Sequence, residues 1–350
     1  MNKFWKNKKV LITGHTGFKG AWLTLILSKM GSEVHGVSLK EKKKSFFNTL
    51  DVNKYLRTNN YQNINDYIKL KKLILRIKPD FIFHLAAQPL VIESYNNPLE
   101  TLMTNIMGTA NLLKSIRNLK NDLTVIIVTS DKCYLPNKQK LFKENDHLGG
   151  NDIYSASKAC AEIISNAYRE SFYKTKKIKI ATVRAGNVVG GGDFSKNRII
   201  PDLIKAYVSK KSCIIRNKNS TRPWQHVLDP INGYLILAKK IHETKNKLYQ
   251  SGWNFGPSTK SYKVAELIHE VKKIISIKIK IKTSENKIKE TKNLRLSNFK
   301  TKKYLNWRPK IDFKDLVKMT LEWYMNQSNK NKIIKITNNQ IDNFFKIKND

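Results

Sequence analysis

Short apolar runs alternate with longer amphipathic segments through the first half of the chain. Five runs have the length and apolar content of buried strands: residues 8–14, 33–39, 80–87, 123–129 and 179–184. Four segments repeat apolar residues every three or four positions, as helices do: residues 18–30, 66–78, about 97–119 and 153–173. Strands that alternate with helices pair in parallel, because each crossover between parallel strands needs such a connection.

This pattern predicts an α/β protein with a Rossmann-like, doubly wound parallel sheet. The strands are almost continuously apolar, which is typical of a sheet that helices cover on both faces. After residue 186 the pattern is more irregular, and we expect a first domain of residues 1–186 and a smaller C-terminal lobe of residues 187–350. Segments near residues 225–256 are expected to return to the first domain. The lysine-rich segment 272–303 is expected to be exposed, and the end from Lys330 to pack loosely.

Composition excludes several classes of protein. Of the 350 residues, 40% are hydrophobic, which allows a sizeable core and excludes a wholly disordered chain. No uninterrupted apolar stretch approaches about 18 residues, so we predict no membrane insertion, and the first apolar run is too short for a signal peptide. Cys133, Cys160 and Cys213 lie far apart without a paired motif, which favours a reducing cytoplasm over disulfides or a metal site.

The net charge of +39 has two interpretations. A basic protein can bind a polyanion such as nucleic acid or an anionic membrane surface. Alternatively, the excess of lysine reflects a compositional bias, because Lys, Asn and Ile are all abundant. The lysines are spread along the whole chain, which favours solvated surfaces over one binding arm.

A glycine loop joins the first predicted strand to the first predicted helix, with Gly14, Gly17 and Gly20 at three-residue intervals. Glycine allows a tight turn and a close approach to a pyrophosphate, which the amides at the helix N-terminus then bind. This order of strand, loop and helix predicts a dinucleotide site. The acidic residue expected about 20 positions later has a candidate in Glu41. Because residues 40 and 42–44 are all lysines, the choice between NAD and NADP stays open here.

Tyr154 and Lys158 form a second candidate site. A spacing of four residues places both side chains on one face of a helix. A free tyrosine has a pKa of about 10, and a nearby ammonium group favours the phenolate and lowers that value. Such a pair can accept a proton from a sugar hydroxyl while a hydride leaves the same carbon.

Together, the glycine loop and the Tyr154–Lys158 pair resemble those of the extended short-chain dehydrogenase/reductase superfamily. Further stretches resemble the CDP-glucose 4,6-dehydratase family within it, over about residues 4–307 and more weakly to residue 345. They are residues 84–91 (HLAAQPLV), 129–134 (TSDKCY), 184–193 (RAGNVVGGGD) and 221–227 (TRPWQHV).

The resemblance implies a lyase that converts CDP-glucose to CDP-4-keto-6-deoxyglucose and water by internal hydride transfer through bound NAD. Its products feed deoxysugar and cell-surface polysaccharide synthesis, such as the O-antigen of lipopolysaccharide. It also implies a homo-oligomer, a dimer or a tetramer, built through the two long helices of residues 97–119 and 152–173. No specific nucleic acid is expected as a partner.

The resemblance also assigns residues to roles. The cofactor-binding set comprises Gly14, Thr16, Gly17, Phe18, Gly20, Ala86, Tyr154 and Lys158, and the catalytic set comprises Ser130, Asp131, Lys132, Tyr154 and Lys158. Asp131 is the acid for the departing C6 hydroxyl, and Lys132 is either the base at C5 or a group that stabilises the enolate-like charge. The substrate-binding set comprises Gln88, Asn187, Arg198, Arg222 and His226. No metal site is expected, and Asn105 is expected to brace the active-site lysine.

Two residues differ from the family pattern, and two alternative functions stay open. Asn63 replaces the acidic residue that usually contacts the cofactor adenine, and Ile92 replaces a common arginine. One rival is an epimerase or reductase of the same superfamily, although a simple epimerase needs no acid for a departing C6 hydroxyl. The other rival is a basic nucleic-acid-binding protein.

Overall fold

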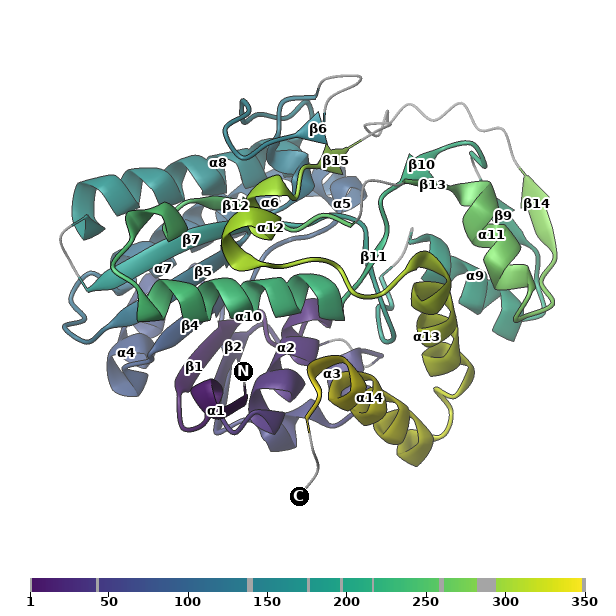
Figure 1. Cartoon of the computed structure of the whole chain (residues 1–350), viewed down its shortest axis with the longest axis horizontal. Helices are drawn as coiled ribbons and strands as arrows, with labels where there is room; N and C mark the ends of the chain where they lie inside the picture. Colours follow the sequence, from purple (N-terminus) through teal and green to yellow (C-terminus); the bar gives the residue numbers. More distant parts are fainter. Residues whose placement is uncertain are drawn as a thin grey trace.

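A seven-stranded parallel sheet forms the centre of the computed structural model (Figure 1). The structure describes residues 2–41, 44–136, 141–174, 177–195, 198–215, 217–257, 261–281 and 294–347. The strands, in spatial order, are β12 (Gly252–Asn254), β7 (Ile178–Arg184), β5 (Leu123–Val128), β4 (Phe81–His84), β1 (Lys9–Thr13), β2 (Glu33–Ser38) and β3 (Thr58–Tyr61). The sequence order reverses beside β1, as it does in a doubly wound sheet, so the predicted fold class is confirmed.

Alternate residues of the central strands enter two separate cores. Val10 and Ile12 face one side, where α2 (Phe18–Lys29) and α10 (Leu228–Glu243) pack. Leu11 faces the other side, which α4 (Tyr67–Ile77) and α7 (Gly108–Ser115) cover. α8 (Ile153–Tyr168) packs beside α7 on that side. The two-residue alternation of a strand thus gives each face its own apolar layer.

The helix predicted over residues 97–119 differs in detail. It runs as α6 (Pro98–Leu102), a π-helical turn η2 (Met103–Met107) and α7, and a separate α5 (Val91–Asn96) precedes it. The π-helical turn carries the buried Asn105, whose amide donates to Ser157 Oγ at 2.9 Å and to the Gln88 carbonyl. Asn105 therefore joins the loop after β4 to α8. The helix predicted to end at residue 173 likewise ends in a π-helical turn, η4 (Arg169–Tyr173).

Residues after 186 contribute to both parts of the molecule. β12 pairs with β7, and α10 packs against β5 and β7, so these segments belong to the sheet. The remaining elements are short strands and the helices beside them: β8 (Val188–Val189), α9 (Ile199–Val208), β9 (Cys213–Ile215), β10 (Thr221–Arg222), β11 (Gln225–His226), β13 (Tyr262–Lys263), α11 (Val264–Lys272), β14 (Ile279–Ile281), β15 (Arg295–Leu296), α12 (Phe299–Leu305) and α13 (Phe313–Met325). Of the segment 272–303 that was expected to be exposed, residues 282–293 lie outside the described residues.

The C-terminal segment corrects one expectation. Residues from Lys330 form α14 (Lys330–Phe345), which buries Ile333 and Ile341, whereas loose packing was expected; residues 348–350 lie outside the described residues. The indole of Trp323 in α13 donates to Thr337 at 2.9 Å, and an ion pair of 3.1 Å joins Asp342 to Lys29 of α2. The apolar spacing of α14 outweighs its polar composition, because one apolar stripe is sufficient for docking.

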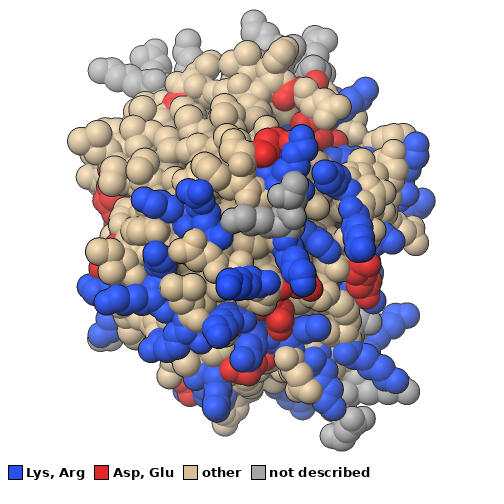
Figure 2. Space-filling view, turned by 90° about the vertical axis from the view of Figure 1, so that its left-hand side faces the viewer, with Lys and Arg blue, Asp and Glu red and all other residues tan. Residues whose placement is uncertain are grey.

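Several shorter elements complete the structure. They are α1 (Asn2–Trp5), α3 (Phe46–Thr49), η1 (Val52–Tyr55), η3 (Asp131–Cys133), β6 (Leu141–Phe142) and η5 (Lys247–Tyr249). Figure 2 shows the face toward which α4, α7 and α8 extend at the left of Figure 1. Lys and Arg are scattered over the middle and lower parts of that face among acidic side chains, whereas its upper part carries few charges. Among the described residues, no helix is both long enough and apolar enough to cross a membrane.

Candidate active site

The glycine loop leaves β1 and enters α2 beside the carboxyl end of β4. Gly14 has a φ of +75°, and a Cβ there would lie 2.6 Å from the Ala86 nitrogen. A Cβ on Gly20 would collide with the Gly14 carbonyl oxygen. Gly17 caps α2 without a side-chain hydrogen bond, so the first amides of the helix face outward with no side-chain acceptor from the cap. The loop therefore has the backbone geometry that a pyrophosphate requires.

The end of β2 places an acidic side chain, that of Glu41, beside the glycine loop. Thr16 Oγ1 lies 2.8 Å from Ser38 Oγ, which ties the loop to the end of β2. Glu41 follows β2, and its Oε2 is buried without a hydrogen-bond partner among the described residues. A carboxylate at this position suits a ribose diol, so the residues present fit NAD. Lys42 and Lys43 lie outside the described residues, and Lys44 Nζ lies 4.9 Å from the centre of the Phe194 ring.

Asn63 takes a local role beside this edge. Its Oδ1 accepts a hydrogen bond of 2.9 Å from the Asn65 amide. Asn65 Oδ1 is buried without a hydrogen-bond partner among the described residues. The position where an acidic residue is usual therefore carries a polar amide and not a carboxylate.

The residues Ser130, Asp131 and Lys132 form a turn directly after β5. Ser130 caps the 3-10 turn η3: its Oγ accepts from the Lys132 amide at 3.2 Å and donates to Asp131 Oδ1 at 2.9 Å. Asp131 is buried, and its carboxylate lies against Gly186, which follows β7. This turn lies at the carboxyl edge of the sheet, where ligands of doubly wound folds bind.

Tyr154 and Lys158 extend from the first turns of α8 toward that turn. The Tyr154 hydroxyl lies near the Ser130 side chain, and Asp131 lies within electrostatic reach of it. Lys158 is buried and donates to the Val128 carbonyl at 3.4 Å. The structure therefore brings together Ser130, Asp131, Tyr154 and Lys158, as the sequence predicted from two separate motifs.

Burial sets the pKa values of this pair. It raises the pKa of Tyr154 to about 12, an effect that Asp131 reinforces and that Ser130 and Arg198 oppose. The net shift is upward and not downward, because desolvation of the phenolate dominates, and the expected lowering by Lys158 stays a prediction. Burial also lowers the pKa of Lys158 to about 8, and the positive charge of Lys19 adds to this decrease.

A charged cluster, defined as Lys19, Asp131, Asp193 and Arg198, adjoins the catalytic groups. Lys19 lies in the first turn of α2, and burial and Arg198 together lower its pKa to about 8. Arg198 lies 3.7 Å from Asp193 and within electrostatic reach of Tyr154. Two cations that face each other in a partly buried place favour an anionic ligand.

Comparisons with known proteins agree with this geometry. A family model described as GDP-mannose 4,6 dehydratase matches residues 11–320. The chain belongs to this family. It is 40% identical to the CDP-glucose 4,6-dehydratase of Salmonella typhimurium over 92% of the chain and 91% of that relative. It is 27% identical to the human dTDP-D-glucose 4,6-dehydratase over 91% of the chain and 90% of that relative.

Solved structures of other proteins share the fold. A UDP-glucose 4-epimerase from Thermotoga maritima with UDP-glucose aligns with a TM-score of 0.79 at 20% identity, covering 91% of this chain and 99% of that one. A dTDP-glucose 4,6-dehydratase from Bacillus anthracis in complex with NAD aligns with a TM-score of 0.76 at 20% identity, covering 94% and 99%. The family model and the relative from Salmonella typhimurium confirm the resemblance found in the sequence, to nucleotide-sugar 4,6-dehydratases.

The substrate-binding residues predicted for this dehydratase family lie in different settings. Arg198 belongs to the charged cluster, and Asn187, with a φ of +52°, follows β7 by three residues. Arg222 lies in the β10–β13 sheet, where its Nη1 donates to the Thr221 carbonyl at 2.9 Å. Gln88 uses its side-chain amide within its own loop and with α6, through Leu90 and Thr101.

His226 is the most deeply buried residue of the predicted substrate set. It is fully buried in β11, beside the Trp22 ring, and its Nδ1 accepts from the Leu228 amide at 3.4 Å. Burial lowers its pKa to about 3, so the imidazole is neutral. A side chain with no exposed surface favours a structural role over a direct substrate contact, although its Nε2 is buried without a hydrogen-bond partner among the described residues. Among the described residues, no cluster of metal-ligating side chains occurs, so His226 has no partners for a metal.

Sequence reasoning missed Lys19, Asp193, Glu162 and Arg184. Lys19 lies inside the glycine motif, where an ammonium group has no apolar packing role. This position could have indicated a functional residue. Glu162 follows Lys158 by four residues and therefore shares its helix face. Its partner Arg184 is 22 residues away on β7, and only the fold brings them together at 2.8 Å.

Proposed function

We propose that this chain is an NAD-dependent lyase that converts CDP-glucose to CDP-4-keto-6-deoxyglucose and water. The observation that carries the proposal is the meeting of Tyr154 and Asp131 at the Ser130 side chain, next to the glycine loop. A phenol, a hydroxyl and a carboxyl group at one point provide the proton donors and acceptors for oxidation at C4 and elimination at C6. The relative that is 40% identical over 92% of the chain supports CDP-glucose as the substrate.

The cofactor would lie along the carboxyl edge of β1, β4 and β2. The backbone of Gly14, Gly17, Phe18 and Gly20 would hold its pyrophosphate, Thr16 would line the loop, and Glu41 would hold a ribose diol. Ala86 would border the cofactor, and Tyr154 and Lys158 would reach its nicotinamide end. When bound, NAD supplies an oxidant for C4 and the reductant that C6 later requires.

The catalytic residues would each move or hold a proton. Tyr154 accepts the proton of the C4 hydroxyl in its phenolate form, which the positive charge of Lys158 must favour against the burial that raises its pKa to about 12. Ser130 holds that hydroxyl by a hydrogen bond. Once C4 is a ketone, the hydrogen at C5 is acidic, and Asp131 protonates the departing C6 hydroxyl. Lys132 either removes the C5 proton or stabilises the charge that its removal creates.

The residues from 187 onward would bind most of the nucleotide diphosphate. Arg198 and Lys19 supply positive charge at the reaction centre, and Arg222 with Asn187 would contact the phosphates from the second lobe. Gln88 and His226 are left out of this proposal, because one is held by its own loop and the other is fully buried.

Mass spectrometry of products tests the proposal. Purified protein with NAD is incubated with the glucose derivatives of CDP, dTDP, GDP and UDP. We expect a product lighter by one water, with CDP-glucose converted fastest. A product of unchanged mass and inverted C4 would support an epimerase instead, and no conversion of any sugar would refute the dehydratase.

Lys132→Met separates the two roles of Lys132. The variant is incubated with the substrate in deuterated water. If reduced nicotinamide still accumulates but deuterium no longer enters C5, Lys132 is the base. If deuterium enters C5 at the wild-type rate, another group removes the proton, and Lys132 acts on the developing charge.

We also propose that the chain forms a homo-oligomer, a dimer or a tetramer, through α6, η2 and α8. Exposed apolar side chains follow this surface at helical spacing: Leu99, Met103, Met107 and Ile163. α6 and η2 pack directly against α8, so these side chains belong to one face. An apolar face of this kind is typical of an interface. Sedimentation velocity should show a dimer or larger that Met103→Glu dissociates; a monomeric wild type would refute the proposal.

A cytoplasmic setting belongs to the same proposal. Cys133, Cys160 and Cys213 are all free thiols, as a reducing compartment allows. The 4-keto-6-deoxy product would then serve deoxysugar and cell-surface polysaccharide synthesis.

A further inference from the structure

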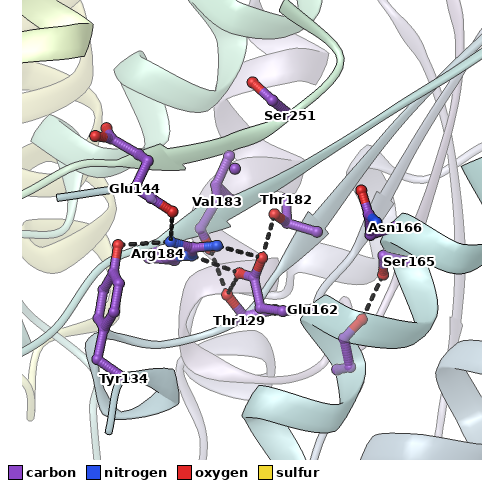
Figure 3. Close-up of polar contacts among 12 residues, drawn as sticks. Thr129, Tyr134, Glu144, Glu162, Ser165, Asn166, Thr182, Val183, Arg184 and Ser251 are labelled. Atoms are coloured by element: carbon purple, nitrogen blue, oxygen red, sulfur yellow. Dashed lines mark hydrogen bonds and ion pairs between the residues drawn. The ribbon is translucent and has the colours of Figure 1, made fainter. Parts of the chain in front are cut away.

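Glu162 and Arg184 form a buried ion pair that the proposed reaction does not use directly (Figure 3). Glu162 lies in α8, one turn after Lys158, and Arg184 is the last residue of β7. Arg184 Nε donates to Oε1 at 2.9 Å and Nη2 to Oε2 at 2.8 Å, so the guanidinium binds both oxygens of the carboxylate. Burial opposes the charge of Glu162, but Arg184 holds its pKa below the ordinary value.

Two threonines complete the carboxylate's set of donors. Thr129, directly after β5, donates to Oε1 at 2.5 Å, and Thr182 in β7 donates to Oε2 at 2.5 Å (Figure 3). Each oxygen of Glu162 therefore accepts two hydrogen bonds. A buried carboxylate with four donors is held in one place, because any displacement leaves a polar group without a partner.

The far side of Arg184 extends the network beyond the sheet. Its Nη1 donates to the Tyr134 hydroxyl at 2.5 Å and to the Glu144 carbonyl at 3.0 Å. The Tyr134 hydroxyl in turn donates to Asn254 Oδ1 of β12 at 2.8 Å. Figure 3 shows Tyr134 and Glu144 converging on the guanidinium from the side opposite Glu162.

The residues that this network holds enclose the catalytic turn. Thr129 immediately precedes Ser130, and Tyr134 follows Lys132 by two residues. We propose that Glu162 and Arg184 are positioning residues: they fix both ends of the Ser130–Lys132 turn, so that the turn faces Tyr154. The inference rests on the proposed dehydratase function. Displacing catalytic groups by about 1 Å can cost about 100-fold in rate, so such a restraint has a measurable consequence.

The Glu162 carboxylate also affects the pKa of Lys158, so a pH profile provides a second test of the inference. The titratable groups that face Lys158 are Lys19 from α2, Cys133 from η3, His84 from β4 and Glu162 from its own helix. Burial keeps His84 neutral by lowering its pKa to about 3. Glu162 favours the ammonium form of Lys158 and therefore opposes the effects of burial and Lys19. Removing the charge of Glu162 must move the titration of Lys158 to lower pH.

Glu162→Gln tests both effects in the full-length protein. The substitution keeps the shape but places an amide N–H group against Arg184. We expect kcat to fall by about 10- to 100-fold, with KM little changed, and the alkaline limb of the kcat profile to move to lower pH. Urea unfolding gives the folded fraction, and calorimetry with CDP shows whether nucleotide binding persists, as we expect.

Two further variants separate geometry from charge. Arg184→Lys keeps the positive charge but cannot reach Glu162 and Tyr134 together, so kcat should fall while the alkaline limb stays in place. Glu170→Gln is the matched control, because Glu170 is an exposed partner of Lys174 at the end of the same helix. It should change neither kcat nor the pH profile.

The outcomes are distinct. The wild type is assayed first, so a failure of the proposed function appears as absence of dehydrated product in the wild type. The inference is overturned if Glu162→Gln retains wild-type kcat. It is also overturned if kcat falls only in proportion to the folded fraction and the alkaline limb does not move, because the pair then serves stability alone.

Discussion

Two groups of charged side chains meet the same catalytic turn but differ in how completely they are paired. The pair Glu162–Arg184 is saturated: every oxygen of the carboxylate has two donors, and the guanidinium reaches further acceptors. The charged cluster is not, since Lys19 faces Arg198 and burial lowers its pKa to about 8. Saturated charges hold a structure in place, whereas charges that lack close partners are available to a ligand.

The two groups are therefore expected to have opposite effects on the free energy of unfolding when one of their charges is removed. Removing one partner from the saturated pair leaves a buried charge alone and destabilises the fold. Removing Lys19 from the charged cluster relieves a desolvated group that Arg198 repels, and should stabilise the protein without ligand at the expense of function. Comparing stability with turnover in matched variants therefore distinguishes the groups.

The largest effect on turnover is expected from Tyr154→Phe. It removes the hydroxyl that lies near the Ser130 side chain, and with it the proposed proton acceptor for the C4 hydroxyl. A general base contributes about 100- to 10,000-fold, so kcat should fall within that range, measured by product mass spectrometry. Tyr168→Phe, in the last turn of the same helix, is the control and should keep wild-type kcat. Equal activity of Tyr154→Phe and the wild type would remove Tyr154 from the catalytic set.

The largest effect on stability is expected from Arg184→Met. It leaves the Glu162 carboxylate buried with two threonine donors, which should cost about 3–5 kcal/mol in the free energy of unfolding. The double variant Glu162→Met/Arg184→Met should recover much of this loss, because no buried charge remains. Urea unfolding of the three proteins measures both values. A single variant that loses less than about 1 kcal/mol would show that the pair is not desolvated.

The sequence predicted those parts of the fold and of the site that depend on local patterns. Apolar runs located β1, β2, β4, β5 and β7, and a spacing of four residues placed Tyr154 and Lys158 together. β3 was missed because its residues, Thr58–Tyr61, are mostly polar and it lies at the sheet edge. The link from Glu162 to Arg184 was invisible because it depends on the register between a helix and a strand, which no local spacing encodes.

Burial was the other quantity that the sequence could not supply. The pKa of Tyr154 was expected to fall through Lys158, but desolvation raises it to about 12. His226 stands in a motif rich in Arg and Trp that indicated substrate contact, yet β11 places it inside the core. A motif shows which residues occur together, whereas exposure follows from how distant segments pack.

Lys19→Met tests the second of the two groups, the charged cluster. Because Lys19 lowers the pKa of Lys158, its removal raises that pKa, and the alkaline limb of kcat should move to higher pH. This direction is opposite to the one expected for Glu162→Gln. Loss of one cation at the proposed reaction centre should lower kcat/KM by about 10- to 100-fold.

Unfolding measurements complete the test of Lys19. The variant should unfold at the same or higher urea concentration than the wild type in the absence of ligand, because a desolvated charge has been removed. Lys29→Met, at the other end of α2 and paired with Asp342, is a suitable control, and its alkaline limb should not move. A limb that stays in place in Lys19→Met would mean that Lys19 and Lys158 do not interact.

The smallest effect on turnover is expected from His226→Gln. The side chain is fully buried, so KM for the nucleotide sugar should stay within about twofold, in contrast to a substrate contact worth about 1–3 kcal/mol.

The pH dependence of the free energy of unfolding reports the role of His226 instead. Its pKa is about 3 in the fold against 6.5 in the unfolded chain, so the unfolded state binds one more proton between these values. The wild type therefore loses stability as pH falls through this window, by up to about 1.4 kcal/mol per pH unit from this group. The variant should have a shallower slope between about pH 4 and 6, while Asp229, whose pKa burial raises to about 6, affects both proteins equally. A large increase in KM with an unchanged slope would return His226 to the substrate-binding set.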